Sequence, residues 1–428
     1  MNNRKGLFLG ETKILSELCD SITDCHHSTP KWTDNGRLVI RNFNIKKGRL
    51  SLSDPSFTND ETFNERIKRK KPESGDLIIT REAPMGEVCI IPEDLECCLG
   101  QRMVLLKPNK KKVLGSYLLY ALQSEFVQTQ IQKSDKTGSI VSNLRIPDLE
   151  QLNIPVFDTI TQEKIGSILK NIDSKIEINN SINAVLEEMA KTIYNFWFVQ
   201  FDFPISAEQA ASMGKPQLNG KPYKTNGGKM VWNEELKREI PEGWEVKNLT
   251  KEMDLQYGFP FSTELFNDNG IGVPVIRIRD ILNCSISNYS TEEVDDKYRI
   301  NKGDIIVGMD GNFHINYWNR DNCYLNQRSL RIRSNNGSIS EIQARYSIEP
   351  FIQAREKNVS RTTVAHLSAK DVNDLKILKA DNDFQTKANN CFKSILEKLV
   401  SNRIQNQKLA DLRDWLLPML MNGQVRVG

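Results

Sequence analysis

Two kinds of hydrophobic pattern alternate along the chain. Short apolar runs such as DLIIT (76–80), EVCII (87–91) and MVLLK (103–107) are rich in β-branched residues and bounded by Gly, Pro and Asp, so they predict strands. The segments 116–130 and 345–358 have a helical pattern instead. These features predict globules of mixed α and β structure.

Each region of short runs is followed by a long segment whose apolar positions recur at alternating steps of four and three residues. This heptad period predicts a long helix with a seam that is apolar at both ends and polar in the middle. The matching polar positions favour pairing of the two helices with each other over separate packing of each helix on its own globule. The first seam comprises Ile168, Ile172, Lys175, Asn179, Ile182, Leu186, Met189 and Ile193, and the second comprises Ile395, Leu399, Asn402, Asn406, Leu409, Leu412 or Arg413, Leu416 and Leu420.

The order of the elements constrains how the two helices would pair. Because each helix follows its own globule, antiparallel pairing would place the globules at opposite ends of a helical spacer and relate them by a pseudo-two-fold axis. Residues 160–197 would span roughly 57 Å as a helix. We therefore expect an α+β fold with two similar mixed α/β domains, separated by two long helices that pair as an antiparallel coiled coil.

Internal repetition supports this symmetry. VIRN (39–42) recurs as VIRI (275–278), and LGQR (99–102) recurs as LNQR (325–328). The segment that begins with Gly75-Asp76 has a counterpart that begins with Gly303-Asp304, 228 residues later. Two further phrases, DLEQLNI and SILK, recur as DVNDLKI and SILE at nearly the same offset. Ordered matches at one offset indicate a duplicated template.

The patterns divide the chain into five parts. We expect the first globule at 1–157, the first long helix at 158–200 and a linker rich in Gly, Pro, Lys and Asn at 201–240. The second globule is expected at 241–380 and the second long helix at 381–428.

Composition narrows the class of protein. The hydrophobic content of 39% and the charged content of 26% are typical of a soluble globular protein, and no apolar run is long enough to span a bilayer. The N-terminus lacks the pattern of a signal peptide, so we expect a cytoplasmic protein without a membrane partner. The eight scattered cysteines indicate reduced thiols, and the net charge of +3 permits a polyanionic partner without requiring one.

Motifs for catalysis are incomplete. The tetrapeptide DPSF (54–57) resembles an amino-methyltransferase motif but lacks its second proline and an upstream Gly-rich turn. Gly214-Lys215 is followed by Pro216, so it forms no phosphate-binding loop, and the cluster of Cys19, Cys25, His26 and His27 lacks the spacing of a zinc site. We expect no catalytic residue, no metal and no cofactor on this chain.

The chain does have features that suit nucleic-acid binding. Cationic runs at 66–71 and 107–112 could neutralise phosphates, although a solvated surface is the alternative. Arg81 and the Gln-Arg pairs at 101–102 and 327–328 are residue types that bond to base edges, Arg to guanine and Gln to adenine. Duplicated scaffolds with unlike loops would recognise unlike sequences.

The chain resembles the specificity (S) subunit of type I restriction-modification systems over nearly its whole length. The resemblance rests on GDLIITREAPMGEVCIIPE with LGQRMVLLKP, on IPDLEQLNIPVFDTITQEKIGSILKNIDSKIE and on PEGWE at the start of the second globule. It departs from the family where Gln162-Glu163 replaces the usual Glu-Gln order and where VGMDGNF replaces TREAPMG in the second globule.

The resemblance implies a non-catalytic DNA-binding subunit. Each globule would be a target recognition domain that contacts one half of a bipartite target in double-stranded DNA, and the helices would set the spacing. Two methyltransferase (M) subunits carrying S-adenosylmethionine would dock on the helices, and restriction (R) subunits that use ATP and Mg would join through them. A stand-alone methyltransferase or fused restriction enzyme, and a coiled-coil scaffold without DNA binding, are the alternatives.

The candidate DNA contacts come from both globules. In the first we expect Arg41, Arg81, Gln101, Arg102, Lys136, Thr137 and Ser139; in the second we expect Arg277, Arg279, Asp310, Asn312, Gln327, Arg328, Arg361 and Thr362.

Overall fold

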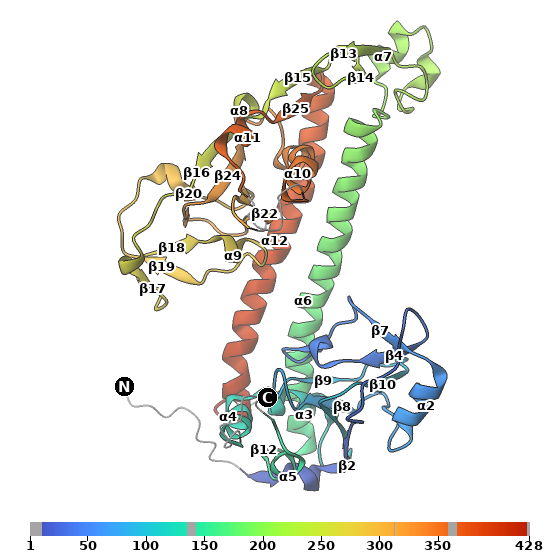
Figure 1. The fold of residues 1–428 in the computed structure, drawn as a ribbon, viewed down its shortest axis with the longest axis vertical. Coiled ribbons are helices and arrows are strands. Elements are labelled where there is room, and N and C mark those ends of the chain that lie inside the picture. The colour runs from blue at the N-terminus through green and yellow to red at the C-terminus, as the bar shows by residue number, and fades with distance from the viewer. Residues whose placement is uncertain (1–10, 135–142, 312, 358–365, 426–428) are drawn as a thin grey trace. The chain divides into compact units, whose positions relative to one another are not determined.

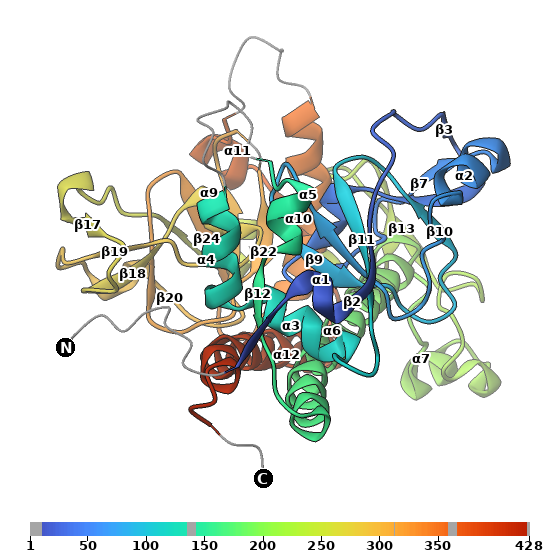
Figure 2. The same ribbon diagram turned by 90° about the horizontal axis from the view of Figure 1, so that it is seen from below.

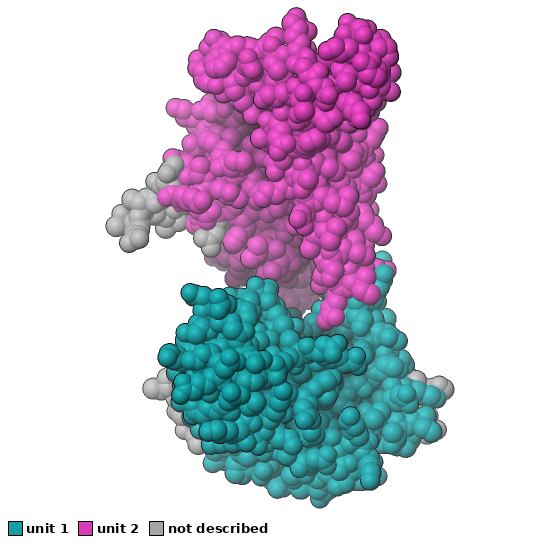
Figure 3. Space-filling model, turned by 90° about the vertical axis from the view of Figure 1, so that its right-hand side faces the viewer, with its two compact units in different colours: residues 1–176, 408–428 teal, residues 177–407 magenta. Residues whose placement is uncertain are grey.

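The computed structural model describes residues 11–134, 143–311, 313–357 and 366–425. The chain divides into two compact units: unit 1 comprises residues 1–176 and 408–428, and unit 2 comprises residues 177–407 (Figure 3). Both long helices, α6 (Thr159–Tyr194) and α12 (Asn382–Met421), contribute residues to both units.

Unit 1 contains two four-stranded sheets (Figure 1). One sheet is antiparallel with the order β2-β11-β8-β9, and the other has the order β10-β4-β7-β3 with β10 parallel to β4. Two short pairs, β1-β12 and β5-β6, complete the strands. The bounds are β1 Thr12–Ile14, β2 Cys19–Asp24, β3 Trp32–Thr33, β4 Arg37–Ile40, β5 Ile45–Lys46, β6 Arg49–Leu50, β7 Ser56–Thr58, β8 Leu77–Thr80, β9 Val88–Ile90, β10 Cys97–Leu99, β11 Met103–Pro108 and β12 Asn153–Pro155.

Helix α3 packs on the antiparallel sheet, whereas Phe63 of α2 packs against Val39 of β4 and Cys98 of β10 in the other sheet. The apolar segment Tyr117–Leu122 of α3 is buried throughout, together with Leu77 of β8 and Val88 of β9. Ile165 of α6 and Leu420 of α12 belong to the same core, and Figure 2 shows α3 beside the ends of these two helices. The bounds are α1 Leu15–Leu18, η1 Asn42–Asn44, α2 Asp60–Ile67, α3 Gly115–Gln123, α4 Glu125–Ser134 and α5 Ile146–Glu150.

Unit 2 repeats the strand plan of unit 1. The antiparallel order β16-β24-β21-β22 matches β2-β11-β8-β9, and the parallel pair β18-β23 matches β4-β10. The predicted α+β class is confirmed by this arrangement. The strand bounds are β13 Met230–Asn233, β14 Arg238–Pro241, β15 Glu245–Asn248, β16 Met253–Tyr257, β17 Phe266–Asn267, β18 Val273–Ile276, β19 Asn288–Ser290, β20 Arg299–Ile300, β21 Ile305–Gly308, β22 Ile315–Tyr317, β23 Cys323–Leu325, β24 Ser329–Ser334 and β25 Lys376–Lys379.

The helices of unit 2 are short, except for α10 and the parts of α6 and α12 that belong to this unit. The π-helical turn η2 (Asn195–Val199) continues α6, so this helix covers nearly all of the predicted range 158–200. The other bounds are α7 Ala207–Ser212, η3 Pro216–Leu218, α8 Leu249–Glu252, η4 Thr263–Leu265, α9 Ile278–Ile281, η5 Asp296–Tyr298, α10 Glu341–Lys357 and α11 Ala369–Asn373. No helix in the described part of the chain combines the length and apolar character needed to cross a membrane.

The two long helices make polar contacts with each other within unit 2. Asn179 Nδ2 donates to Asn406 Oδ1 at 2.8 Å, and Asn402 Nδ2 donates to Asn183 Oδ1 at 2.8 Å. Higher numbers in α6 therefore meet lower numbers in α12, which is antiparallel order. Whether the helices also supercoil as a coiled coil stays a prediction.

The predicted seam on α6 is wrong at Lys175, Ile182 and Met189, although Asn179 between them is buried. The side chains of Ile182 and Met189 are exposed (37% and 47%), whereas the neighbouring Asn183 and Ala190 are buried. The sequence favoured Ile182 because it is apolar, but Asn183 can be buried because its amide is hydrogen-bonded to α12. Of the other predicted seam residues, Ile172, Asn179, Ile395 and Leu399 are buried, and Ile168, Leu186, Asn406, Leu409 and Leu416 are partly buried.

The expected linker is an ordered part of unit 2. Phe201, Phe203 and Tyr223 belong to the main core of this unit. The ring of Phe203 stacks on those of Tyr223 and Trp244, with centroids 4.6 and 4.8 Å apart. The segment is rich in Gly, Pro, Lys and Asn, and this composition obscured the few aromatic side chains that anchor it.

Candidate nucleic-acid interface

A Gln-Arg turn occupies equivalent positions in the two units. Arg102 in unit 1 and Arg328 in unit 2 both have left-handed backbone conformations, with φ of 67° and 62°. Arg81 N donates to the carbonyl of Arg102 at 2.7 Å, as Met309 N does to the carbonyl of Arg328 at 2.9 Å. The sequence repeat LGQR and LNQR therefore marks one local structure built twice.

A carboxylate accompanies the arginine of each turn. Arg102 Nε lies 3.2 Å from Glu82 Oε2, and Arg328 Nη1 lies 2.9 Å from Asp310 Oδ2. Both guanidinium groups are more exposed than their partners: 52% against 24% in unit 1, and 68% against 16% in unit 2. His366 Nδ1 lies 2.5 Å from the other oxygen of Asp310. Sequence reasoning did not single out His366 as a site residue.

A second arginine lies beside each turn. Gly100 N donates to the carbonyl of Ile40 at 2.8 Å, so Arg41 lies next to Gln101 and Arg102. In unit 2, Asn326 N donates in the same way to Ile276 at 3.0 Å and brings Arg277 close to Gln327 and Arg328. The backbone N–H of each second arginine donates to a side chain three residues later, Arg41 to Asn44 and Arg277 to Asp280, both at 2.9 Å.

Aromatic rings surround the second arginine of unit 1. The Arg41 guanidinium lies 4.8 Å from the ring centroid of Trp32 and 4.4 Å from that of Phe43. Both rings are largely exposed, at 42% and 44%. Exposed aromatic and cationic groups in contact are typical of nucleic-acid surfaces. Trp32 and Phe43 were missed by sequence reasoning, because no local pattern relates them to Arg41.

The corresponding surface of unit 2 is a hollow of about 520 Å³. Arg279 Nη2 donates to Asn288 Oδ1 at 2.7 Å, and Arg277 Nη1 donates to the same oxygen at 3.1 Å. The hollow thus gathers several predicted contacts on one surface. It is lined by Arg277, Ile278, Arg279, His314, Asn326, Gln327 and Arg328.

The side chain of Arg81 is mostly buried and bonds to other parts of unit 1, so its role is structural. Its side chain is 11% exposed. Nη1 donates to both carboxylate oxygens of Asp24 at 3.0 Å, and Nε donates to the carbonyl of Leu144 at 2.9 Å. These bonds leave Arg81 little freedom to contact a base, and they hold the loop that carries Glu82.

Burial and ion pairing reduce the positive charge that the predicted cationic runs could offer to phosphates. Arg66 is buried and donates to the carbonyl of Leu99 at 2.9 Å, and burial lowers the pKa of its guanidinium. Lys71 lies 2.7 Å from Glu96, and Lys107 pairs with Glu73. Six predicted contacts lie outside the described residues: Lys136, Thr137, Ser139, Asn312, Arg361 and Thr362.

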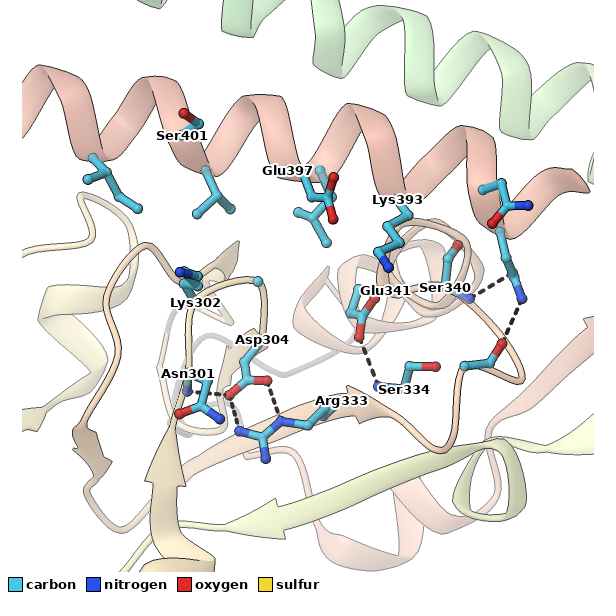
Figure 4. Close-up of a pocket in the computed structure, with 17 residues that line it drawn as sticks. Asn301, Lys302, Asp304, Arg333, Ser334, Ser340, Glu341, Lys393, Glu397 and Ser401 are labelled. Carbon is cyan, nitrogen blue, oxygen red and sulfur yellow. Dashed lines mark hydrogen bonds and ion pairs between the residues drawn. The ribbon is translucent and has the colours of Figure 1, made fainter. Parts of the chain in front are cut away.

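Another hollow of unit 2, of about 880 Å³, lies between α10, α12 and the loop before β21 (Figure 4). Arg333 donates to both oxygens of Asp304 at 2.6 Å, and Glu341 accepts from Ser334 N at 3.0 Å. Burial raises the pKa of Glu341. The dashed lines in Figure 4 mark these bonds: Arg333 and Asp304 pair with each other, and Glu341 accepts from a backbone N–H. Within the described ranges, no three His, Cys, Asp or Glu side chains are grouped to hold a metal ion.

Comparison with known proteins gives one consistent family. A family model described as "Type I restriction modification DNA specificity domain" matches residues 15–188 and 241–379. The chain is 25% identical to the type I restriction enzyme MjaIX specificity subunit of Methanocaldococcus jannaschii, covering 82% of this chain and 78% of that one. It is 23% identical to the HindI specificity subunit of Haemophilus influenzae, covering 83% and 88%. The crystal structure of the type I restriction-modification S subunit from M. genitalium has a similar fold, with a TM-score of 0.59, 16% identity, and 98% and 97% coverage.

Proposed function

This chain belongs to the type I restriction modification DNA specificity domain family, and we propose that each of its two units recognises one half of a bipartite target in double-stranded DNA. Its role is sequence-specific DNA recognition as a non-catalytic specificity subunit. The alternatives, a stand-alone methyltransferase or restriction enzyme and a scaffold without DNA binding, receive no support from the comparisons.

The duplicated Gln-Arg turn is the observation that carries this proposal. Each unit presents the same turn with an arginine and a carboxylate, at Arg102 with Glu82 and at Arg328 with Asp310. The surroundings of the turns differ: aromatic rings flank Arg41, whereas Arg277 and Arg279 line a hollow. One scaffold with two unlike surfaces suits two unlike half-sites, because base contacts determine sequence preference.

Side-chain exposure guides the choice of the proposed DNA contacts. We place base or phosphate contacts at the arginines and glutamines of these two surfaces and a base contact at the carboxylate of Asp310, and we assign Arg81 to support of the first surface because its guanidinium is bonded to Asp24. The contacts in the described residues are Arg41, Gln101, Arg102, Arg277, Arg279, Asp310, Gln327 and Arg328.

The long helices would set the distance between the half-sites. α6 is one continuous helix of 36 residues, about 54 Å long at 1.5 Å per residue. A helix of fixed length would favour one number of unspecified base pairs between the two blocks of the target.

An exposed apolar stripe on α6 and η2 supports docking of methyltransferase subunits. Its residues recur at heptad spacing and are between 37% and 55% exposed, although they are large and apolar. Such a contiguous stripe indicates a protein partner, and its period suits a partner helix. On α12, Leu412 and Trp415 are also exposed, at 43% and 54%, which would suit a second subunit. The α6 stripe comprises Ile178, Ile182, Val185, Met189, Phe196 and Val199.

The remaining chemistry would belong to the partners. S-adenosylmethionine would be held by two methyltransferase subunits, and ATP and Mg by restriction subunits that join through them. Such an assembly would act in the cytoplasm, where the target DNA is.

Selection of bound duplexes from a randomised DNA pool tests the proposal. The full chain should enrich two short conserved blocks separated by a constant number of free positions. Enrichment of one continuous block, or of no sequence, would contradict recognition by two units.

A further inference from the structure

The arginine and the carboxylate at each turn form an ion pair on the proposed DNA-binding surface. In unit 2, Asp310 is partly buried and is held by both Arg328 and His366, whereas the Arg328 guanidinium is largely exposed. In unit 1, the Glu82 side chain is 24% exposed and pairs with Arg102, whose side chain is 52% exposed. In both units the guanidinium is more exposed than the carboxylate beside it, and in unit 2 His366 also fixes that carboxylate.

Stability does not explain why both units keep this pair. Ion pairs with an exposed partner contribute little to folding. The left-handed conformation of Arg102 and Arg328 is moreover unfavourable for residues other than glycine. An arrangement that adds strain and little stabilisation, and that is built twice, points to a role in binding.

Contact with a phosphate does not suit the pair either. A carboxylate 2.9 or 3.2 Å from the guanidinium would repel a phosphate that approached the same group. Base edges differ, because the major groove presents donors as well as acceptors. Guanine offers O6 and N7 as acceptors, and the paired cytosine offers its N4 amino group as a donor.

We propose that each pair recognises one G·C base pair in the major groove, Arg328 with Asp310 in one half-site and Arg102 with Glu82 in the other. The arginine donates to guanine O6 and N7, and the carboxylate accepts from cytosine N4. A guanidinium has five N–H donors, so its bond to the carboxylate leaves enough donors for a bidentate contact. This inference rests on the proposed function, in which each unit recognises one half of the target.

Selection from the randomised pool, repeated with variants of the full chain, tests the pairing. Arg328→Ala and Asp310→Ala should both relax the same single G·C position in one block, by roughly ten-fold or more, and leave the other block unchanged. Arg102→Ala and Glu82→Ala should do the same in the other block. Lys237→Ala is the matched control, because it removes one partner of an exposed ion pair elsewhere in unit 2.

A base analogue tests the contact without changing the protein. Substituting 7-deazaguanine at the identified position removes the N7 acceptor, and it should weaken binding by the wild-type chain but not by Arg328→Ala. If the wild type enriches two blocks but Arg328→Ala and Asp310→Ala relax different positions or none, the pairing is overturned while recognition by two units stands. If the wild type enriches no sequence, the proposed function itself fails.

Discussion

Asp173 and Arg413, 240 residues apart in the sequence, form an ion pair at 2.8 Å within unit 1. Arg49 and Tyr120 donate to the same carboxylate, each at 2.8 Å. Burial raises the pKa of Asp173, but the three hydrogen bonds outweigh it, so the pKa lies below its ordinary value. The carboxylate therefore joins α6, α12 and the first globule through charged hydrogen bonds.

Replacing this carboxylate should destabilise unit 1. Asp173→Asn removes the carboxylate that Arg49 and Arg413 share, although Arg413 keeps its bond to Asp414. We expect a loss of about 2 kcal/mol in the free energy of unfolding at pH 7, less than for a fully buried pair. Because the folded pKa is depressed, the stabilisation is present above the unfolded pKa of about 3.9 and is lost as pH falls through the lower folded value. Urea unfolding at neutral and acidic pH should show the difference shrink in acid.

A variant on α12 provides the control. Lys387 forms an ion pair with Asp383 at 2.7 Å, and both side chains are exposed. Lys387→Gln should leave the urea midpoint unchanged. An Asp173→Asn variant as stable as this control at pH 7 would show that the hydrogen bonds to Asp173 contribute nothing to stability.

The amides of Asn183 and Asn402 should be energetically coupled. Both side chains are buried, and Asn183 also donates to the carbonyl of Leu399 at 3.3 Å. Asn402→Leu leaves the Asn183 carbonyl oxygen without this donor, which should destabilise unit 2 by about 1–3 kcal/mol. Asn183→Leu with Asn402→Leu should lose less than the sum of the single changes, because both polar groups are removed. A double-mutant cycle measures this, and simple additivity would contradict the coupling.

Local patterns in the sequence predicted the elements of this fold well. The heptad period predicted bounds for the long helices close to those of α6 and α12. The period and the helices agree because both reflect the burial of apolar side chains. The repeated phrases LGQR and LNQR likewise identified two equivalent turns, since similar sequences in similar contexts fold alike.

Contacts between distant residues could not be predicted in this way. Arg81 is an arginine in a loop, as many base-contacting residues are. Its guanidinium is nevertheless bonded to Asp24, which lies 57 residues away in the sequence. The pairing of Trp32 with Arg41 depends on strands β3, β7 and β4 lying side by side, which no short pattern reveals. The predicted seam of α6 is wrong at Ile182 because hydrogen bonding, invisible in the sequence, allows Asn183 to be buried.

A charge on the exposed stripe of α6 should prevent assembly without unfolding the chain. Val185 is 55% exposed, and glutamate is compatible with a helix, so Val185→Glu should leave thermal unfolding unchanged. Its affinity for the methyltransferase subunit should fall at least ten-fold, because a charge would be buried without a partner. Co-purification and titration with that subunit measure the effect.

Lys191→Glu is the matched control, because it adds the same residue at an exposed position of α6 outside the stripe. Normal assembly of this control with failure of Val185→Glu would locate the docking surface. Equal assembly of both variants would exclude the stripe as that surface.

Substitution of Arg41 distinguishes base contact from phosphate contact in unit 1. The guanidinium contacts the exposed rings of Trp32 and Phe43 and donates to Ser56 Oγ at 3.4 Å, and these contacts restrict its orientation. Arg41→Lys keeps the charge but loses the planar donor group, so a base contact predicts roughly ten-fold weaker discrimination in one half-site. The dependence of binding on salt should then stay unchanged, because the number of neutralised phosphates is the same. Binding measured over a salt series, with Trp32→Leu expected to cause a smaller loss in the same half-site, decides the matter. A reduced salt slope for Arg41→Ala, with normal discrimination by Arg41→Lys, would place Arg41 on the phosphate backbone instead.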